Sequence, residues 1–267
     1  MLPVEGGEVW AQDTGHVVAA SAYARDRGDA IVLLHPGWAD SRIWEQVLAR
    51  LRDQHRVIRY DARGYGSSPP PAAPFTQLGD LTAVLDQLKV RHAILVGHSG
   101  GASPAISLAL DHPDRVSALV LLAPGVHDYP WPQDDPYGPE FEAAFMAGDA
   151  EALTALGLRT WAAASADPAA EAQIRAAALA FLRQGDFEQP DPATFSKLAE
   201  LGVPAVVVVG DRDYPMVDHC ARTIADRIPG CELVTVPGAD HMLPLRAPGL
   251  IADVIRSCAS QARLGSV

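Results

Sequence analysis

The sequence is poor in cysteine, and the few cysteines it has do not form a recognisable metal site. They are Cys220, Cys231 and Cys258, an odd number without the spacing of metal ligands. A scaffold built on disulfides or on a structural metal is therefore disfavoured. We expect a reducing, cytoplasmic environment, no metal, and cysteines that pack as small apolar side chains.

Basic residues and long apolar runs are also scarce. Lysine and arginine number 21 against 33 acidic residues, which gives a formal net charge of −12. Nucleic acids and anionic membrane surfaces would be repelled on average by such a chain. The chain has neither a basic start followed by an apolar core nor a run of membrane-spanning length. We expect neither nucleic acid nor membrane as a partner, and the oligomeric state is left open.

What the sequence does contain is the pattern of a folded α/β protein. Short continuous apolar runs alternate with amphipathic helical segments along most of the 267 residues. The runs of strand length are 31–34, 56–60, 93–96, 118–122, 205–210 and 232–236. Continuous apolar strands separated by helices are typical of a parallel sheet covered on both faces. We therefore predict an α/β fold with a mostly parallel central sheet and helices on both faces.

Two parts of the chain depart from this alternation. Residues 8–23 hold short apolar stretches broken by Asp13-Thr14-Gly15, which predicts an antiparallel hairpin near the start. Later the pattern becomes alanine-rich and helical, without a strand, over 139–147, 149–164 and 168–184. We predict a core made of residues 1–123 and 202–267, with a helical subdomain of residues 124–201 inserted into it.

The most informative stretch is Gly97-His98-Ser99-Gly100-Gly101. It follows the apolar run that begins at Ala93 and precedes an alanine-rich helical segment, so Ser99 lies on a tight strand-to-helix turn. Gly97 and Gly101 remove the Cβ atoms that would collide as the helix folds back over the strand. The start of the helix also leaves backbone N–H groups free to face a developing negative charge. We predict that Ser99 is a nucleophile.

A serine hydroxyl needs a base to accept its proton, and histidine is the usual choice. Of nine histidines, His241 follows the last strand on the sharp turn 237–242, where it can reach the edge of the sheet that carries Ser99. Seven other histidines have different expected roles. Those at helix ends or on helix surfaces are His55, His92, His112 and His219. We expect His35 and His98 to pack within loops or to support the site from behind, and His127 lies at the border of the insertion. We predict that His241 is the base.

A carboxylate should orient that base, and the loop after the strand 205–210 offers two. Asp213 lies farther out on the loop and is better placed to meet His241, whereas Asp211 is suited to accept backbone hydrogen bonds within the turn. Asp128, after the preceding strand, is a third candidate. We predict Asp213 as the partner of His241.

With Ser99, Asp213 and His241 in this chain order, the sequence resembles the α/β-hydrolase superfamily over nearly its whole length. Two further pieces carry the resemblance. Residues 35–38 are similar to the family's H-G-x loop with a proline inserted, and residues 61–68 are similar to its D-x-R-G-x-G-x-S loop.

The resemblance implies a site without metal or organic cofactor. The backbone N–H groups of Trp38 and Gly100 would form an oxyanion hole, with Gly37 as the alternative to Trp38 because the inserted Pro36 shifts the register. Many relatives carry a larger residue, usually methionine, where Gly100 stands, so the turn would be roomier here.

By the same resemblance, the insertion would be a lid over the site. Its aromatic residues predict an apolar or aromatic small-molecule substrate, although an aromatic side chain on a helix more often packs in a core. The residues expected to line the pocket are Trp131, Tyr137, Phe145 and Trp161.

The function predicted from these residues is hydrolysis of a carboxylic ester or lactone through an acyl-enzyme. Three enzymatic alternatives use the same triad: a lyase, a C–C hydrolase and a cofactor-free perhydrolase. A non-catalytic ligand-binding receptor of the same fold is a fourth alternative. Serine as the nucleophile argues against dehalogenase and epoxide-hydrolase chemistry, which starts from aspartate in this superfamily.

Overall fold

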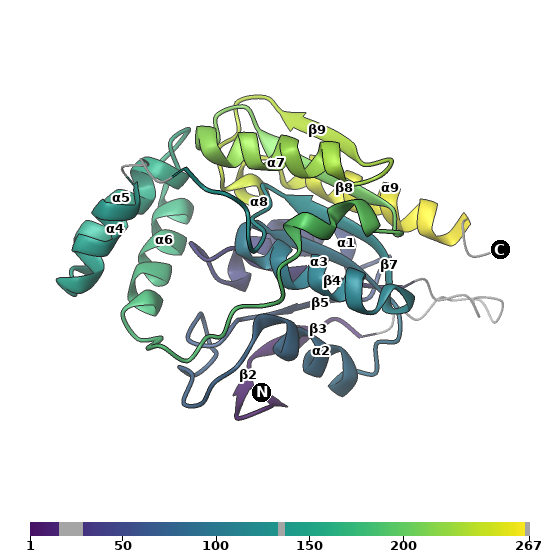
Figure 1. Ribbon diagram of the computed structural model, residues 1–267, viewed down its shortest axis with the longest axis horizontal. Helices are drawn as coiled ribbons and strands as arrows, with labels where there is room; N and C mark the ends of the chain where they lie inside the picture. The colour runs from purple at the N-terminus through teal and green to yellow at the C-terminus, as the bar shows by residue number, and fades with distance from the viewer. Residues whose placement is uncertain (16–28, 133–136, 265–267) are drawn as a thin grey trace.

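The computed structural model describes residues 1–15, 29–132 and 137–264 (Figure 1). Within these ranges seven strands form one sheet in the order β3-β5-β4-β6-β7-β8-β9. Their bounds are β3 Ala11–Asp13, β4 Ala30–Leu34, β5 Val57–Tyr60, β6 Ala93–His98, β7 Val116–Leu122, β8 Ala205–Gly210 and β9 Glu232–Val236. β3 runs antiparallel to β5, and every other neighbouring pair is parallel. The predicted α/β class with a mostly parallel sheet is confirmed.

Helices connect these strands. The α-helices are α1 Glu45–Leu51, α2 Gln77–Gln87, α3 Ala102–Asp111, α4 Tyr137–Met146, α5 Ala150–Trp161, α6 Pro168–Phe181, α7 Pro215–Arg227, α8 Leu243–Arg246 and α9 Pro248–Leu264. Shorter 3-10 turns are η1 Ser41–Trp44, η2 Ser99–Gly101, η3 Pro113–Arg115 and η4 Phe195–Glu200. None of the helices in the described ranges combines the length and apolar composition that a membrane crossing needs.

The central strand β6 shows how the sheet builds two cores. All six of its residues are buried, and successive side chains point to opposite faces. Ile94 and Val96 join an apolar cluster that includes residues of α1 and α9, whereas Ala93 and Leu95 join one that includes residues of α2, α3 and α7. Helices therefore cover both faces, as the continuous apolar runs predict.

The antiparallel hairpin lies earlier in the chain than predicted. β1 (Leu2–Val4) pairs with β2 (Gly7–Val9) around Gly6, whose φ of 67° suits glycine in this turn. The next strand, β3, pairs with β5 rather than with β2. Residues 16–23 of the predicted hairpin lie outside the described residues.

Helices α4, α5 and α6 follow one another between β7 and β8, and Figure 1 shows them grouped at one end of the molecule, away from the C-terminus. Gly157 of α5 fixes how closely they pack. A Cβ atom there would lie 2.6 Å from both Ile174 of α6 and the ring of Trp38, so only glycine fits without displacement. The helical segment is thereby pressed against the loop that follows β4.

The parallel strands bring several loops to one edge of the sheet. Because β4, β6, β7, β8 and β9 all run the same way, their carboxyl ends lie together. The loops that follow them carry Trp38, Ser99, Asp213 and His241. The fold thus collects the four principal predicted positions at one edge.

Candidate active site

Ser99 lies on a sharp turn between β6 and α3 with an unusual backbone conformation. Its φ is 51°, in the left-handed region that side chains other than glycine seldom adopt. A Cβ on Gly97 would lie 2.6 Å from the backbone of Ala102, and a Cβ on Gly101 would lie 2.7 Å from the carbonyl oxygen of Leu34. Main-chain atoms cannot move aside, so both positions require glycine and the turn holds Ser99 in place.

The residue after Ser99 faces the loop that follows β4. A Cβ on the exposed Gly100 would have only one neighbour within 4 Å, the backbone nitrogen of Gly37 at 3.8 Å. In that loop the N–H of Ala39 donates to the carbonyl of Pro36 at 3.2 Å, and in the described part of the chain the N–H groups of Gly37, Trp38 and Gly100 form no hydrogen bond. These three donors are available to an acceptor beside Ser99.

Asp213 and His241 form a buried pair. Both carboxylate oxygens of Asp213 lie 3.1 Å from Nδ1 of His241, and both side chains are almost fully enclosed. A carboxylate can only accept, so Nδ1 donates and Nε2 is left without the proton. An imidazole in this tautomer can accept a proton at Nε2.

Close packing of two loops brings this pair together. A Cβ on Gly210, the last residue of β8, would lie 2.1 Å from the carbonyl oxygen of Ala239, so the loops after β8 and β9 meet without space for a side chain. The N–H of Tyr214 donates to the Asp213 carboxylate at 2.7 Å. Asp211 accepts instead from the N–H of Gly238 at 2.6 Å.

His98 links the turn of Ser99 to the loop of His241. Its Nε2 donates to the backbone carbonyl of His241 at 2.8 Å, and the two imidazole rings lie 5.1 Å apart between centroids. His98 is fully buried, and burial lowers the pKa of its imidazole well below the usual value. A neutral His98 therefore holds the His241 loop beside Ser99.

The imidazole of His241 also contacts the helical segment. The ring of Trp161, the last residue of α5, lies 4.7 Å from it between centroids. Asp240, the buried residue before His241, accepts from the N–H of Ala164 at 2.9 Å and binds Arg246, which also contacts Asp167. The loop of His241 is thus fixed to the connection between α5 and α6.

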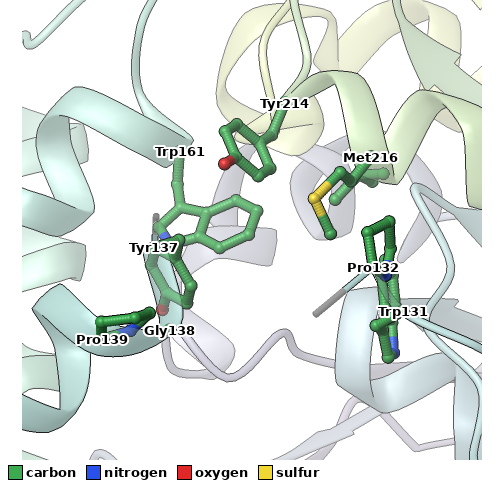
Figure 2. A pocket seen from close by; sticks show the side chains of 9 residues that line it. Trp131, Pro132, Tyr137, Gly138, Pro139, Trp161, Tyr214 and Met216 are labelled. Carbon is green, nitrogen blue, oxygen red and sulfur yellow. The ribbon is translucent and has the colours of Figure 1, made fainter. Parts of the chain in front are cut away.

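An aromatic pocket of about 370 Å³ opens beside this contact. Figure 2 shows Tyr137 and Trp161 on one side of the pocket, Trp131 and Met216 on the other, and Tyr214 between the two sides. Sequence reasoning named three of these residues and missed Tyr214 and Met216. Tyr214 directly follows Asp213 in the sequence, and this adjacency to a predicted site residue could have identified it as a pocket residue.

Phe145 is not among the residues that line this pocket. It lies eight residues after Tyr137 on α4, which is about 12 Å farther along the helix. Phe145 is 38% exposed, and its ring stacks on Phe141 at 5.8 Å between centroids. The structure does not bring Phe145 to the aromatic pocket, because α4 carries it beyond the pocket's end.

The loop at residues 61–68 supports the loop that follows β4. The N–H of Ala62 donates to Nε2 of His35 at 2.9 Å, and the N–H of Ser41 donates to the Asp61 carboxylate at 2.9 Å. The predicted loop packing of His35 takes this form. In the described ranges no group of His, Cys, Asp and Glu side chains is arranged to hold a metal ion.

Comparison with known proteins relates this architecture to a family. The model of the alpha/beta hydrolase family matches residues 31–254. A Bacillus subtilis (strain 168) protein, named only provisionally as a 2-succinyl-6-hydroxy-2,4-cyclohexadiene-1-carboxylate synthase, is 27% identical over 85% of this chain and 89% of its own.

Solved structures show the same similarity. The enol-lactonase from Burkholderia xenovorans LB400 superposes with a TM-score of 0.73 at 23% identity, over 96% of this chain and 98% of its own. Est816, described as an N-acyl homoserine lactone degrading enzyme, superposes with a TM-score of 0.72 at 25% identity over the same shares.

The turn of Ser99 gives a steric prediction. Gly97→Ala should destabilise the fold by about 3 kcal/mol, because the new Cβ meets main chain that cannot retreat. Gly100→Ala is the matched control and should change stability by less than about 0.5 kcal/mol, since its Cβ makes only one ordinary contact, with the nitrogen of Gly37 at 3.8 Å. Urea unfolding of both variants measures this; equal stabilities would contradict the steric account.

Buried His98 gives a pH prediction. Its pKa is depressed in the fold, so the unfolded state binds a proton first as the pH falls below about 6.5, and stability is lost there. Each such proton gives a slope of about 1.4 kcal/mol per pH unit. The variant His98→Gln keeps a donor for the carbonyl of His241. In this variant the slope of unfolding free energy against pH should be smaller by the contribution of about one proton, about 1.4 kcal/mol per pH unit. An unchanged slope in urea unfolding between pH values of about 5 and 6.5 would contradict it.

Proposed function

Because the chain belongs to the alpha/beta hydrolase family, we propose that it hydrolyses a carboxylic ester or lactone through an acyl-enzyme on Ser99. One observation carries the proposal. The buried Asp213–His241 pair is tied through His98 to the turn that holds Ser99 at a φ of 51°. A nucleophile, a base and a group that orients the base are the parts that acyl transfer needs.

In the proposed reaction, Oγ of Ser99 attacks the carbonyl carbon while Nε2 of His241 takes the hydroxyl proton. Asp213 stabilises the imidazolium through Nδ1. The negative charge on the carbonyl oxygen is met by the N–H of Gly100 and by Trp38 or Gly37, three donors that are otherwise unused. The proton then passes to the leaving alkoxide, and water attacks the acyl-enzyme by the same steps in reverse, releasing the acid and Ser99.

The helical segment at residues 124–201 would act as the lid that selects the substrate. Trp131, Tyr137 and Trp161 come from this segment and line the aromatic pocket, and Trp161 contacts the ring of His241. An aromatic pocket of about 370 Å³ suits a small apolar or aromatic group. The substrate would be a small molecule that places this group beside His241.

A direct test compares Ser99 with Ser107, a serine in the helix α3 that follows the turn. Ser99→Ala should lower kcat/KM for phenyl acetate at least about 1,000-fold, because the nucleophile is lost while binding is kept. Ser107→Ala on α3 is the matched control; its buried hydroxyl has no hydrogen-bond partner in the described part of the chain, so activity should persist. Equal rates for Ser99→Ala and the unchanged protein would refute the assignment.

A lyase is the second candidate, because the relative that matches 85% of this chain is named for a synthase. The two reactions differ in the fate of water. Ester hydrolysis in ¹⁸O-labelled water puts the label into the released acid, because water attacks the acyl-enzyme. Mass spectrometry of the products should show one labelled oxygen in the acid; product formed without label would favour the lyase.

A further inference from the structure

A second pocket, of about 250 Å³, lies beside the turn of Ser99. It reaches the turn at Gly100 and at Gly125, whose N–H donates to the carbonyl of Ser99 at 3.0 Å. Its lining combines apolar side chains with two carboxylates, Glu188 and Asp191, and with the polar side chains of Gln77 and His127. We call this pocket, which Ser103, Pro104, Val126 and Trp131 also line, the acidic pocket.

Asp191 is the unusual member of the acidic pocket. It is only 5% exposed, and its Oδ1 accepts from the N–H of Leu78 at 2.9 Å in the first turn of α2. Its Oδ2 is buried and has no hydrogen-bond partner among the described residues. Burial raises the pKa of this carboxyl group. An enclosed carboxylate oxygen without a partner is unfavourable unless something binds it.

The fold alone does not account for a carboxylate at this position. Helix α2 already has a capping residue, Thr76, whose hydroxyl accepts from the N–H of Gly79 at 3.0 Å. The N–H of Leu78 needs a single acceptor, which a neutral asparagine would also supply. The neighbouring carboxylate, Asp80, is fully engaged by Arg63 through two hydrogen bonds of 2.8 and 2.6 Å. The second oxygen of Asp191 therefore keeps a hydrogen-bonding capacity that the described residues do not use.

The acidic pocket and the aromatic pocket meet at one residue, Trp131, which lines both. The aromatic pocket is adjacent to the ring of His241 through Trp161, and the acidic pocket is adjacent to Ser99 through Gly125. Both pockets therefore lie near the site, and they meet at Trp131. The two pockets offer different chemistry to the two ends of a substrate, one being aromatic and the other carrying carboxylates.

We propose that the acidic pocket binds a protonated amine at one end of the substrate, while the aromatic pocket receives an apolar group at the other end. An ammonium N–H would donate to Oδ2 of Asp191, the oxygen that has no partner in the described ranges. Glu188 and Gln77 line the same pocket and add acceptors, and none of the residues lining it is lysine or arginine. The inference rests on the proposed ester hydrolysis and narrows its substrate class to amino esters.

The test uses two pairs of esters at neutral pH, because the pocket does not say which end of the ester carries the amine. The first pair is the dimethylaminoethyl and isopentyl esters of phenylpropanoic acid, in which CH replaces N–H⁺. The second pair consists of two benzyl esters whose acyl chains differ by the same replacement of N–H⁺ by CH. In one of the pairs kcat/KM should favour the amine by about tenfold or more, as expected for a hydrogen bond to a charged group.

Asp191→Asn should reduce that preference about tenfold, since it keeps an acceptor for Leu78 and removes the charge. The preference is a ratio within each variant, so a smaller folded fraction does not alter it. Asp186→Asn is the matched control, an exposed aspartate in the same segment, and should leave the preference unchanged. No preference in either pair, or the same preference in Asp191→Asn, would overturn the proposal.

Binding separates this proposal from the proposed function. The four esters are titrated calorimetrically into Ser99→Ala with and without Asp191→Asn, so that turnover is not needed. If none of the esters is hydrolysed by the unchanged protein, the proposed function fails. The acidic pocket still stands if the amine ester binds about tenfold more tightly than its isostere and loses this advantage with Asp191→Asn. Equal binding of both esters would refute the acidic pocket.

Discussion

The structure depends on the absence of space at the turn after β6. Gly97 and Gly101 each face main-chain atoms at less than 3 Å from where a Cβ would lie, and between them Ser99 takes a φ of 51°. Such a conformation costs free energy and persists only where the surroundings enforce it. Here the surroundings are a central strand that is buried on both faces and a helix that folds directly back over it. The position of the half-buried Ser99 at the carboxyl end of the central strand is therefore a consequence of packing in the core.

The other parts of the site are held relative to this turn by specific contacts. His98 reaches from the turn to the carbonyl of His241, and Gly210 lets the loops of Asp213 and His241 touch. Asp240 and Arg246 then fix the His241 loop to the helical segment. Except for the pair Asp240 and Arg246, these contacts join residues that are distant in sequence, so the site is assembled only when sheet, loops and helical segment pack together. Burial lowers the pKa of His98, so the neutral imidazole is the form that this assembly holds.

Much of the fold follows from local sequence pattern, while the pockets do not. The bounds of β8 and β9 were predicted correctly because both are short apolar runs bounded by turn residues. The hairpin over Leu2–Val9 was not predicted, since this stretch mixes polar and apolar residues without a clear period. Asp213 and His241 could be paired by their loops, and they are hydrogen-bonded. Asp191 could not be singled out, because its importance arises from burial against the start of α2, 113 residues earlier in the chain.

The central claim is that Ser99 is a nucleophile activated by His241 and Asp213, and covalent labelling tests it most directly. The protein is treated with a fluorophosphonate, which reacts with activated serines, and the adduct is located by mass spectrometry of the digested chain. We predict one adduct per chain, on Ser99, and greatly slowed labelling in His241→Gln, because the base is then missing. An unlabelled Ser99, or labelling at an unchanged rate without His241, would contradict the account.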